Sequence, residues 1–166
     1  KSSPVDFIPT ALIKSCNSVF SELISTLANL SFTQGTFPTK YKFAIVSPLL
    51  KKPGLNADDP ASFRPISNLN NISKIIERLF LVRLQPHVTS STNFNQFQSA
   101  YRRHHSTETA LLVTLDSIFR SSDTDKPSTL ISLDLSAAFD MIDHHILLSN
   151  LHNSFGINGS ALKFLE

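Results

Sequence analysis

Three acids and two histidines crowd the most strand-like segment of the sequence. The stretch Ser132 to His145 reads SLDLSAAFDMIDHH and contains Asp134, Asp140 and Asp143. Carboxylates can hold a divalent cation, and imidazoles can ligate a metal. The residue types therefore raise the question of a metal site, and each residue has to be assessed separately.

Asp134 belongs to a strand predicted from Ser128 to Leu135. Successive side chains of a strand point to opposite faces, so Asp134 leaves the sheet opposite the apolar residues of 131–135. A carboxylate at the end of a buried strand is costly unless it binds a cation or a hydrogen-bond donor. A hard cation such as Mg²⁺ suits a phosphate substrate. The alternative is that Asp134 accepts hydrogen bonds from the following turn.

The neighbouring acids have simpler explanations. Asp143 precedes an apolar-periodic helix and is most simply its N-cap. Asp140 fits either role. His144 and His145 lack the spacing of a zinc site, and we interpret them as surface or packing residues. A metal-dependent phosphohydrolase would require Asp134 and these acids to converge with His144.

Basic residues are concentrated in one half of the chain. Between Lys40 and Arg103 lie ten of the fifteen Lys and Arg residues against three of the thirteen acids, so this window is +7 and the rest is −5. A basic half that holds a polyanion is one interpretation, and solvated helix faces are the other.

Periodicity and breakers predict the elements that carry these residues. Apolar residues at helical spacing predict helices over 8–30, from Asn71 or Ser73 to an end at Pro86, from an N-cap at Ser106 to 119, and from Asp143 onward. Strands are predicted over 42–50 and 128–135, a loop over 51–65, and an extended loop or hairpin around 89–105. This order favours a single sheet covered by helices.

Composition limits the remaining possibilities. A hydrophobic content of 41% is enough for a core, no run is long enough for a membrane helix, and the N-terminus lacks the layout of a signal peptide. The lone Cys16 makes a reducing compartment the default.

Three motifs together resemble a known family. FRPISNLNNISKIIERLFLVRL (63–84), QSAYRRHHSTETALL (98–112) and LDLSAAFDMIDHHILLSNL (133–151) follow each other in order. Their order and spacing resemble reverse transcriptases of non-LTR, LINE-type retrotransposons, from about Ala44 to the C-terminus. The resemblance implies an α+β fold, with right-hand polymerase fingers and the first part of the palm, truncated before the second catalytic motif. It divides the chain into an N-terminal helical segment (1–40), fingers (41–127) and the start of the palm (128–166).

The same resemblance implies roles for the palm residues. Asp134 matches the first catalytic aspartate, which ligates Mg²⁺, and the carbonyl of Leu135 would be a further ligand. Phe139 matches the aromatic residue that packs under the sugar of the nucleotide and rejects a ribose; a role in core packing is compatible with this.

The resemblance also implies roles in the fingers. Arg64 matches an arginine that contacts the phosphates of the incoming dNTP, a task that suits a planar bidentate donor. Gln98, Tyr101 and Arg102 match a motif on the template and nucleotide side, although for Arg102 a plain surface position is equally open. The partners implied are an RNA template, a DNA primer and dNTPs, with no membrane, inside the cell in the nucleus and cytoplasm.

The second catalytic motif of the family, an aromatic-Ala-Asp-Asp turn, does not occur in these 166 residues. Two-metal chemistry needs carboxylates that converge from different strands. We therefore expect no polymerase activity from the chain as given. A catalytically silent nucleic-acid-binding remnant is the alternative.

Overall fold

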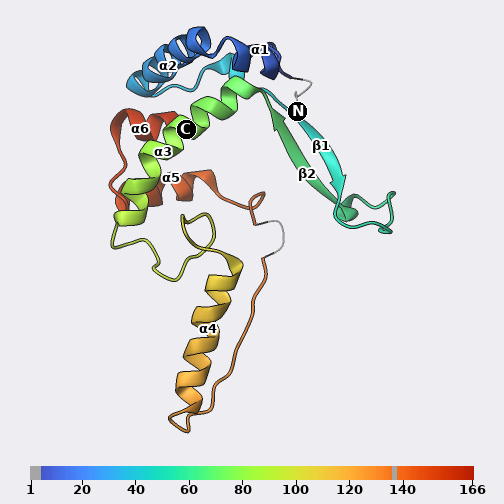
Figure 1. Ribbon diagram of the computed structural model, residues 1–166, viewed down its shortest axis with the longest axis vertical. Helices are drawn as coiled ribbons and strands as arrows, with labels where there is room; N and C mark the ends of the chain where they lie inside the picture. The colour runs from blue at the N-terminus through green and yellow to red at the C-terminus, as the bar shows by residue number, and fades with distance from the viewer. Residues whose placement is uncertain (1–4, 136–137) are drawn as a thin grey trace.

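The structure is a computed structural model, and it describes residues 5–135 and 138–166. Helices and a small sheet alternate along the chain, which agrees with the α+β class at this coarse level (Figure 1). The α-helices are α1 (Thr10–Ser15), α2 (Asn17–Gln34), α3 (Asn71–Ser90), α4 (Thr107–Ser122), α5 (His144–Asn153) and α6 (Gly159–Leu165). The strands are β1 (Ala44–Leu50) and β2 (Phe63–Leu69), and the 3-10 helices are η1 (Thr39–Tyr41) and η2 (Pro60–Ser62).

The long N-terminal helix predicted from the sequence is two helices, α1 and α2. The backbone leaves the helical region at Cys16 (φ −108°, ψ 38°), and α2 then continues past the predicted end to Gln34. Gly35 ends it in the left-handed conformation, at φ 64°. A Cβ at Gly35 would lie 2.7 Å from the carbonyl oxygen of Ser160, so glycine also permits the close approach of α6.

The core lies where α2, α3 and α6 meet. Ala28, Ile76 and Phe164 are buried there, one from each helix. The Phe164 ring lies 5.1 Å from that of Phe32 and 4.4 Å from that of Phe80, measured between ring centroids. These aromatic contacts join the C-terminal helix to α2 and α3, which come much earlier in the chain. Figure 1 shows α6 beside α3.

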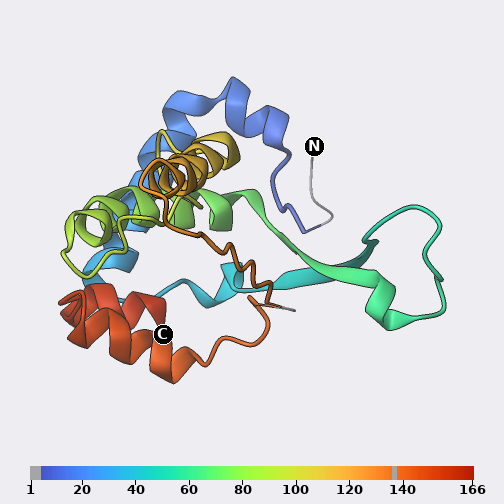
Figure 2. The same cartoon turned by 90° about the horizontal axis from the view of Figure 1, so that it is seen from below.

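Strands β1 and β2 form an antiparallel ribbon that projects from the helices (Figures 1 and 2). The predicted strand over 42–50 is confirmed, but the predicted loop over 51–65 is wrong at its end, because β2 begins at Phe63. Pro48 and Pro65 are partners in the register. The Lys51 N–H donates to the Ser62 carbonyl, so alternation of the ladder places the two prolines at a non-hydrogen-bonded pair. Prolines are tolerated there because the missing N–H groups would point away from the partner strand.

The predicted strand over 128–135 is not a strand in this structure. The segment is extended and runs back alongside α4, and Leu130 and Leu133 are 67% and 88% exposed. A strand pattern becomes a strand only when a neighbour supplies its ladder of hydrogen bonds. The sheet in the described ranges consists of β1 and β2 alone, so this segment has no partner strand. The sheet is single and antiparallel, as predicted, but it projects from the helices and is not covered by them (Figures 1 and 2).

Helix α3 does not end at Pro86 as predicted but continues to Ser90. Proline removes one N–H and crowds the preceding turn, which costs stability without always ending a helix. His87 Nε2 lies 2.7 Å from the Phe155 carbonyl oxygen, and this contact holds the last turn of α3 against the loop after α5.

Both predicted N-caps are confirmed. The Ser106 Oγ accepts from the Thr109 N–H at 3.3 Å, and the Thr109 Oγ1 accepts from the Ser106 N–H at 2.9 Å. The Asp143 carboxylate accepts from the N–H groups of His145 and Ile146. In the described part of the chain, no helix is both long enough and apolar enough to span a bilayer.

Candidate nucleotide and nucleic-acid interface

Arg64 lies on the ribbon, in β2, opposite Leu49 of β1. Its side chain is exposed, as are those of Lys51 and Lys52 in the connection between the two strands. Lys51 Nζ donates to the Ala61 carbonyl at 2.8 Å, which ties this lysine to the far side of the connection. The ribbon therefore presents three cations to solvent on a short, well-hydrogen-bonded scaffold.

The loop between α3 and α4 carries the second group of candidates. Arg102 Nη1 donates to the Gln96 carbonyl at 2.8 Å, and its guanidinium lies 5.5 Å from the centre of the Phe94 ring. Gln98 Nε2 donates weakly to the Ala100 carbonyl at 3.3 Å. Arginine has five N–H donors, so Arg102 is oriented by the loop and still has donors for a phosphate.

Tyr101 and Phe139 come together from segments far apart in the sequence. Their ring centroids are 6.4 Å apart at 79°, an edge-to-face arrangement. Both rings are largely exposed, at 81% and 73%. Tyr101 also has a left-handed backbone, with φ 59°, which is uncommon for a bulky residue and found mostly where surrounding structure imposes it.

Asp134 and Leu135 lie at the end of the extended segment, and both are exposed. Within residues 5–135 and 138–166, no hydrogen bond or ion pair links either of them to Arg64, Gln98 or Arg102. Residues 136–137, which separate them from Phe139, lie outside the described residues. The structure therefore pairs Tyr101 with Phe139 but does not assemble all the candidates into one site.

The resemblance described above implies a divalent metal site, which needs several ligands close together. Among the residues that the structure describes, no three His, Cys, Asp or Glu side chains gather closely enough to hold a metal. One exposed carboxylate, Asp134, does not make a two-metal site. The described residues thus do not fit a complete metal centre.

This finding also contradicts the phosphohydrolase hypothesis. That activity needed Asp134, Asp140, Asp143 and His144 to converge on a metal, and no such group forms among the described residues. Asp143 caps the N-terminus of α5, where its Oδ1 accepts two backbone hydrogen bonds. Asp140 and His144 are exposed.

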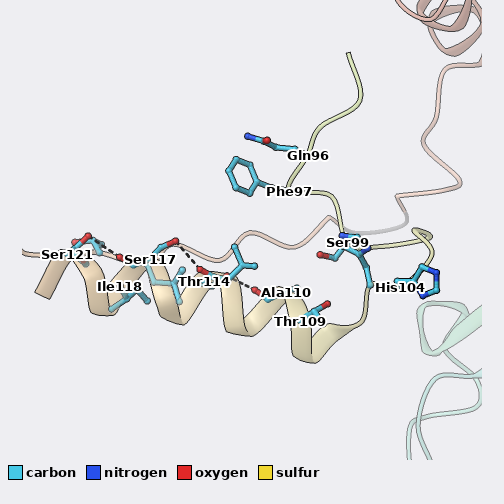
Figure 3. Close-up of a pocket in the computed structure, with 15 residues that line it drawn as sticks. Gln96, Phe97, Ser99, His104, Thr109, Ala110, Thr114, Ser117, Ile118 and Ser121 are labelled. Carbon is cyan, nitrogen blue, oxygen red and sulfur yellow. Dashed lines mark hydrogen bonds between the residues drawn. The ribbon is translucent and has the colours of Figure 1, made fainter. Parts of the chain in front are cut away.

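A cavity of about 660 Å³ lies beside α4 and not at the candidates (Figure 3). It is lined by the hydroxyl-bearing face of α4, by the loop around Phe97 and by the start of the extended segment. The hydroxyls of Thr114, Ser117 and Ser121 each donate to a carbonyl one turn earlier, so they are satisfied within the helix. Sequence reasoning missed this face, although its three- and four-residue spacing is visible in the sequence.

Two carboxyl groups have shifted acidities. Partial burial beside the Phe37 and Phe164 rings raises the pKa of Glu77, and the nearby Lys74 lowers it by less. The Ser106 hydroxyl, followed by a backbone hydrogen bond, lowers the pKa of Glu108 in the first turn of α4. Neither group lies among the candidates, and both shifts follow from helix packing and capping.

Comparison with known proteins identifies the family. The family described as "Reverse transcriptase (RNA-dependent DNA polymerase)" matches residues 50–163, which is more than half of the chain. All seven candidate residues named above fall inside this match.

Three relatives from Drosophila melanogaster are similar to the chain. The probable RNA-directed DNA polymerase from transposon BS is 28% identical over 155 residues, which is 93% of this chain and 17% of the relative. That from transposon X-element is 34% identical over 108 residues, 65% of this chain and 12% of the relative. The RNA-directed DNA polymerase from mobile element jockey is 28% identical over 127 residues, 76% and 14% respectively.

The chain spans less than a fifth of the length of each of these relatives. The family predicted from the three motifs is confirmed by the profile match and by the names of the relatives. The chain therefore belongs to the reverse transcriptase family, and its relatives are the polymerases of non-LTR retrotransposons.

Proposed function

We propose that this chain contributes the fingers (41–127) and the start of the palm (128–166) to an RNA-directed DNA polymerase. The whole enzyme would extend a DNA primer on an RNA template with dNTPs, inside the cell in the nucleus and cytoplasm. One observation carries the proposal: the family match over 50–163 includes β2 with Arg64, the basic connection between the two strands, the loop with Arg102 and the segment with Asp134.

In this proposal the ribbon and the loop bind the polyanionic substrates. Arg64 contacts the triphosphate, because a planar guanidinium can donate two hydrogen bonds to phosphate oxygens. Gln98 and Arg102 face the template and nucleotide. Tyr101 and Phe139 supply an exposed aromatic pair, 6.4 Å apart, and Phe139 discriminates against a ribose.

Asp134 and the carbonyl of Leu135 would supply part of a Mg²⁺ site. Because one carboxylate does not complete it, the chain alone would not catalyse nucleotidyl transfer. Further carboxylates from elsewhere in the polymerase would have to meet Asp134.

The direct test is Asp134→Asn in a full-length polymerase that contains this chain. The substitution keeps the size of the side chain and removes its charge, so Mg²⁺-dependent DNA synthesis on an RNA template should be abolished. Asp123→Asn, an exposed acid after α4, is the matched control and should leave synthesis unchanged. Retained synthesis in Asp134→Asn would contradict the assignment.

A silent nucleic-acid-binding remnant is the second candidate, and the charge of +7 over residues 40–103 favours it. It predicts salt-dependent RNA binding without synthesis in the full-length protein.

A further inference from the structure

Strand β2 of the ribbon is joined to α3 by a very short connection. Strand β2 ends at Leu69 and α3 begins at Asn71, so Asn70 alone separates them. Asn70 is buried, at 3% exposure, and its Oδ1 accepts from the Ser73 N–H at 2.8 Å. This N-cap fixes the start of α3, but it does not by itself fix the direction of β2.

A second, distant residue reaches the same connection. Asp6 Oδ1 accepts from the Asn71 backbone N–H at 2.8 Å, and Asp6 Oδ2 accepts from Asn71 Nδ2 at 2.8 Å. Asn71 Nδ2 also donates to Thr10 Oγ1 at 2.6 Å. Hydrogen bonds to a carboxylate are stronger than neutral ones, and this carboxylate also faces the positive end of the α3 dipole.

The N-terminal segment contacts the other strand of the ribbon as well. Lys40, which precedes β1, places its ammonium 5.1 Å from the centre of the Phe7 ring. Phe7, Lys40 and Asn70 line a pocket of about 240 Å³ together with Phe43 and Ile45 at the start of β1. The segment 5–10 therefore lies across the base of the ribbon, next to the start of β1 and to the connection that follows β2 (Figure 1).

We propose that Asp6 is a positioning residue. Through its hydrogen bonds to Asn71, the segment 5–10 holds the ribbon, and thus Arg64, at a fixed angle to α3. The role of Arg64 at the triphosphate rests on the proposed function, whereas the fixed angle does not. The hydrogen bonds described for Asp6 go to Asn71, which is not a candidate for substrate binding.

The angle is measured with spin labels in the full-length polymerase. One label is placed at Leu55→Cys in the ribbon connection and one at Arg78→Cys on α3, with the exposed Cys16 changed to Ser. With Asp6 and Asn71 unchanged, the distances between the two labels should fall in a narrow distribution. Asp6→Ala should broaden it, because both carboxylate oxygens that accept from Asn71 are lost. Glu22→Ala, an exposed acid on α2, is the matched control and should leave it narrow.

A reciprocal exchange keeps the test decisive if Asp6→Ala does not fold. Asp6→Asn places an amide against the amide of Asn71, so it should also broaden the distribution. Adding Asn71→Asp to Asp6→Asn restores a donor–acceptor pair across the same 2.8 Å contact and should narrow the distribution again. The positioning role of Asp6 would be contradicted by a broad distance distribution in the double variant Asp6→Asn, Asn71→Asp. It would also be contradicted by a narrow distribution in both Asp6→Ala and Asp6→Asn.

The kinetic consequence is a change in nucleotide binding. Asp6→Ala should raise KM for dNTP about fivefold to tenfold with little change in kcat, because a misdirected Arg64 weakens binding without touching the reacting atoms. The reciprocal exchange should restore KM. If the full-length protein makes no DNA at all, the proposed function fails. The label distances would still show whether Asp6 fixes the angle between the ribbon and α3. If it makes DNA and KM is unchanged in Asp6→Ala, the positioning role fails.

Discussion

At the residue scale, side chains whose partners lie nearby in the sequence were predicted correctly. Ser106 and Asp143 cap the helices that follow them because their partners are two or three residues away. Asp6 was not recognised, because its partner Asn71 lies 65 residues along the chain and no local pattern marks such a contact. The contact between the Arg102 guanidinium and the Phe94 ring was missed because it depends on the path of the loop.

Glu77 gives a pH-dependent prediction at this scale. Partial burial raises its pKa above the ordinary value of 4.5, so the folded protein binds more protons than the unfolded one at pH values between 4.5 and the raised pKa. Its contribution to the free energy of unfolding is therefore fully present below pH 4.5 and falls as the pH rises through that window.

Glu77→Gln should remove this part of the pH dependence, so the free energy of unfolding should change less between pH 4 and 7 than in the unmodified protein. Urea unfolding at several pH values measures it, with Glu22→Gln on exposed α2 as the control. Equal pH slopes for Glu77→Gln and the unmodified protein would contradict the predicted burial of this carboxyl.

At the element scale, helical periodicity predicted the helices, and tertiary contacts decided where they end. The apolar spacing located α3 and α4, yet α3 passes through Pro86 because contacts such as that of His87 with the Phe155 carbonyl hold its last turn. The strand predicted over 128–135 failed for the opposite reason. Its alternating pattern is real, but a strand depends on a neighbour that the local sequence does not specify.

Pro86 supplies the prediction for the elements. Pro86→Ala restores the missing N–H inside α3 and should raise the free energy of unfolding by about 1–3 kcal/mol. Thermal or urea unfolding measures the change. Pro53→Ala, in the exposed ribbon connection outside any helix, should alter stability by less than about 0.5 kcal/mol. A less stable Pro86→Ala variant would mean that proline is required in α3.

At the scale of the whole molecule, the sequence predicts the distribution of charge. It does not predict how the candidate residues are arranged relative to one another. The excess of cations over residues 40–103 includes the ribbon, whose lysines are exposed. The Tyr101–Phe139 contact brings two of the motif segments together, but the order of the motifs does not specify such a contact. No group that could hold a metal forms around Asp134 in the described part of the chain, so its role as a metal ligand stays a prediction.

The charge distribution predicts how RNA binding responds to salt. Each phosphate contact contributes a slope of about −0.7 to the plot of log affinity against log salt for single strands. Lys52→Ala in the full-length protein should make this slope shallower by about that amount, whereas Lys126→Ala, an exposed lysine outside the basic window, should not. Binding that does not depend on salt would contradict a polyanion-binding role for the basic half.

The geometry of the ribbon turns it into a lever. Arg64 lies six residues from the pivot at Asn70, which at about 3.3 Å per residue is an arm of roughly 20 Å. A tilt of only about 5° at the pivot would move Arg64 by nearly 2 Å, and a misplacement of about 1 Å can already cost a hundredfold in rate. A small change of angle at Asn70 would thus become a larger displacement at Arg64. The stiffness of the connection at Asn70 is therefore a property on which selection can act.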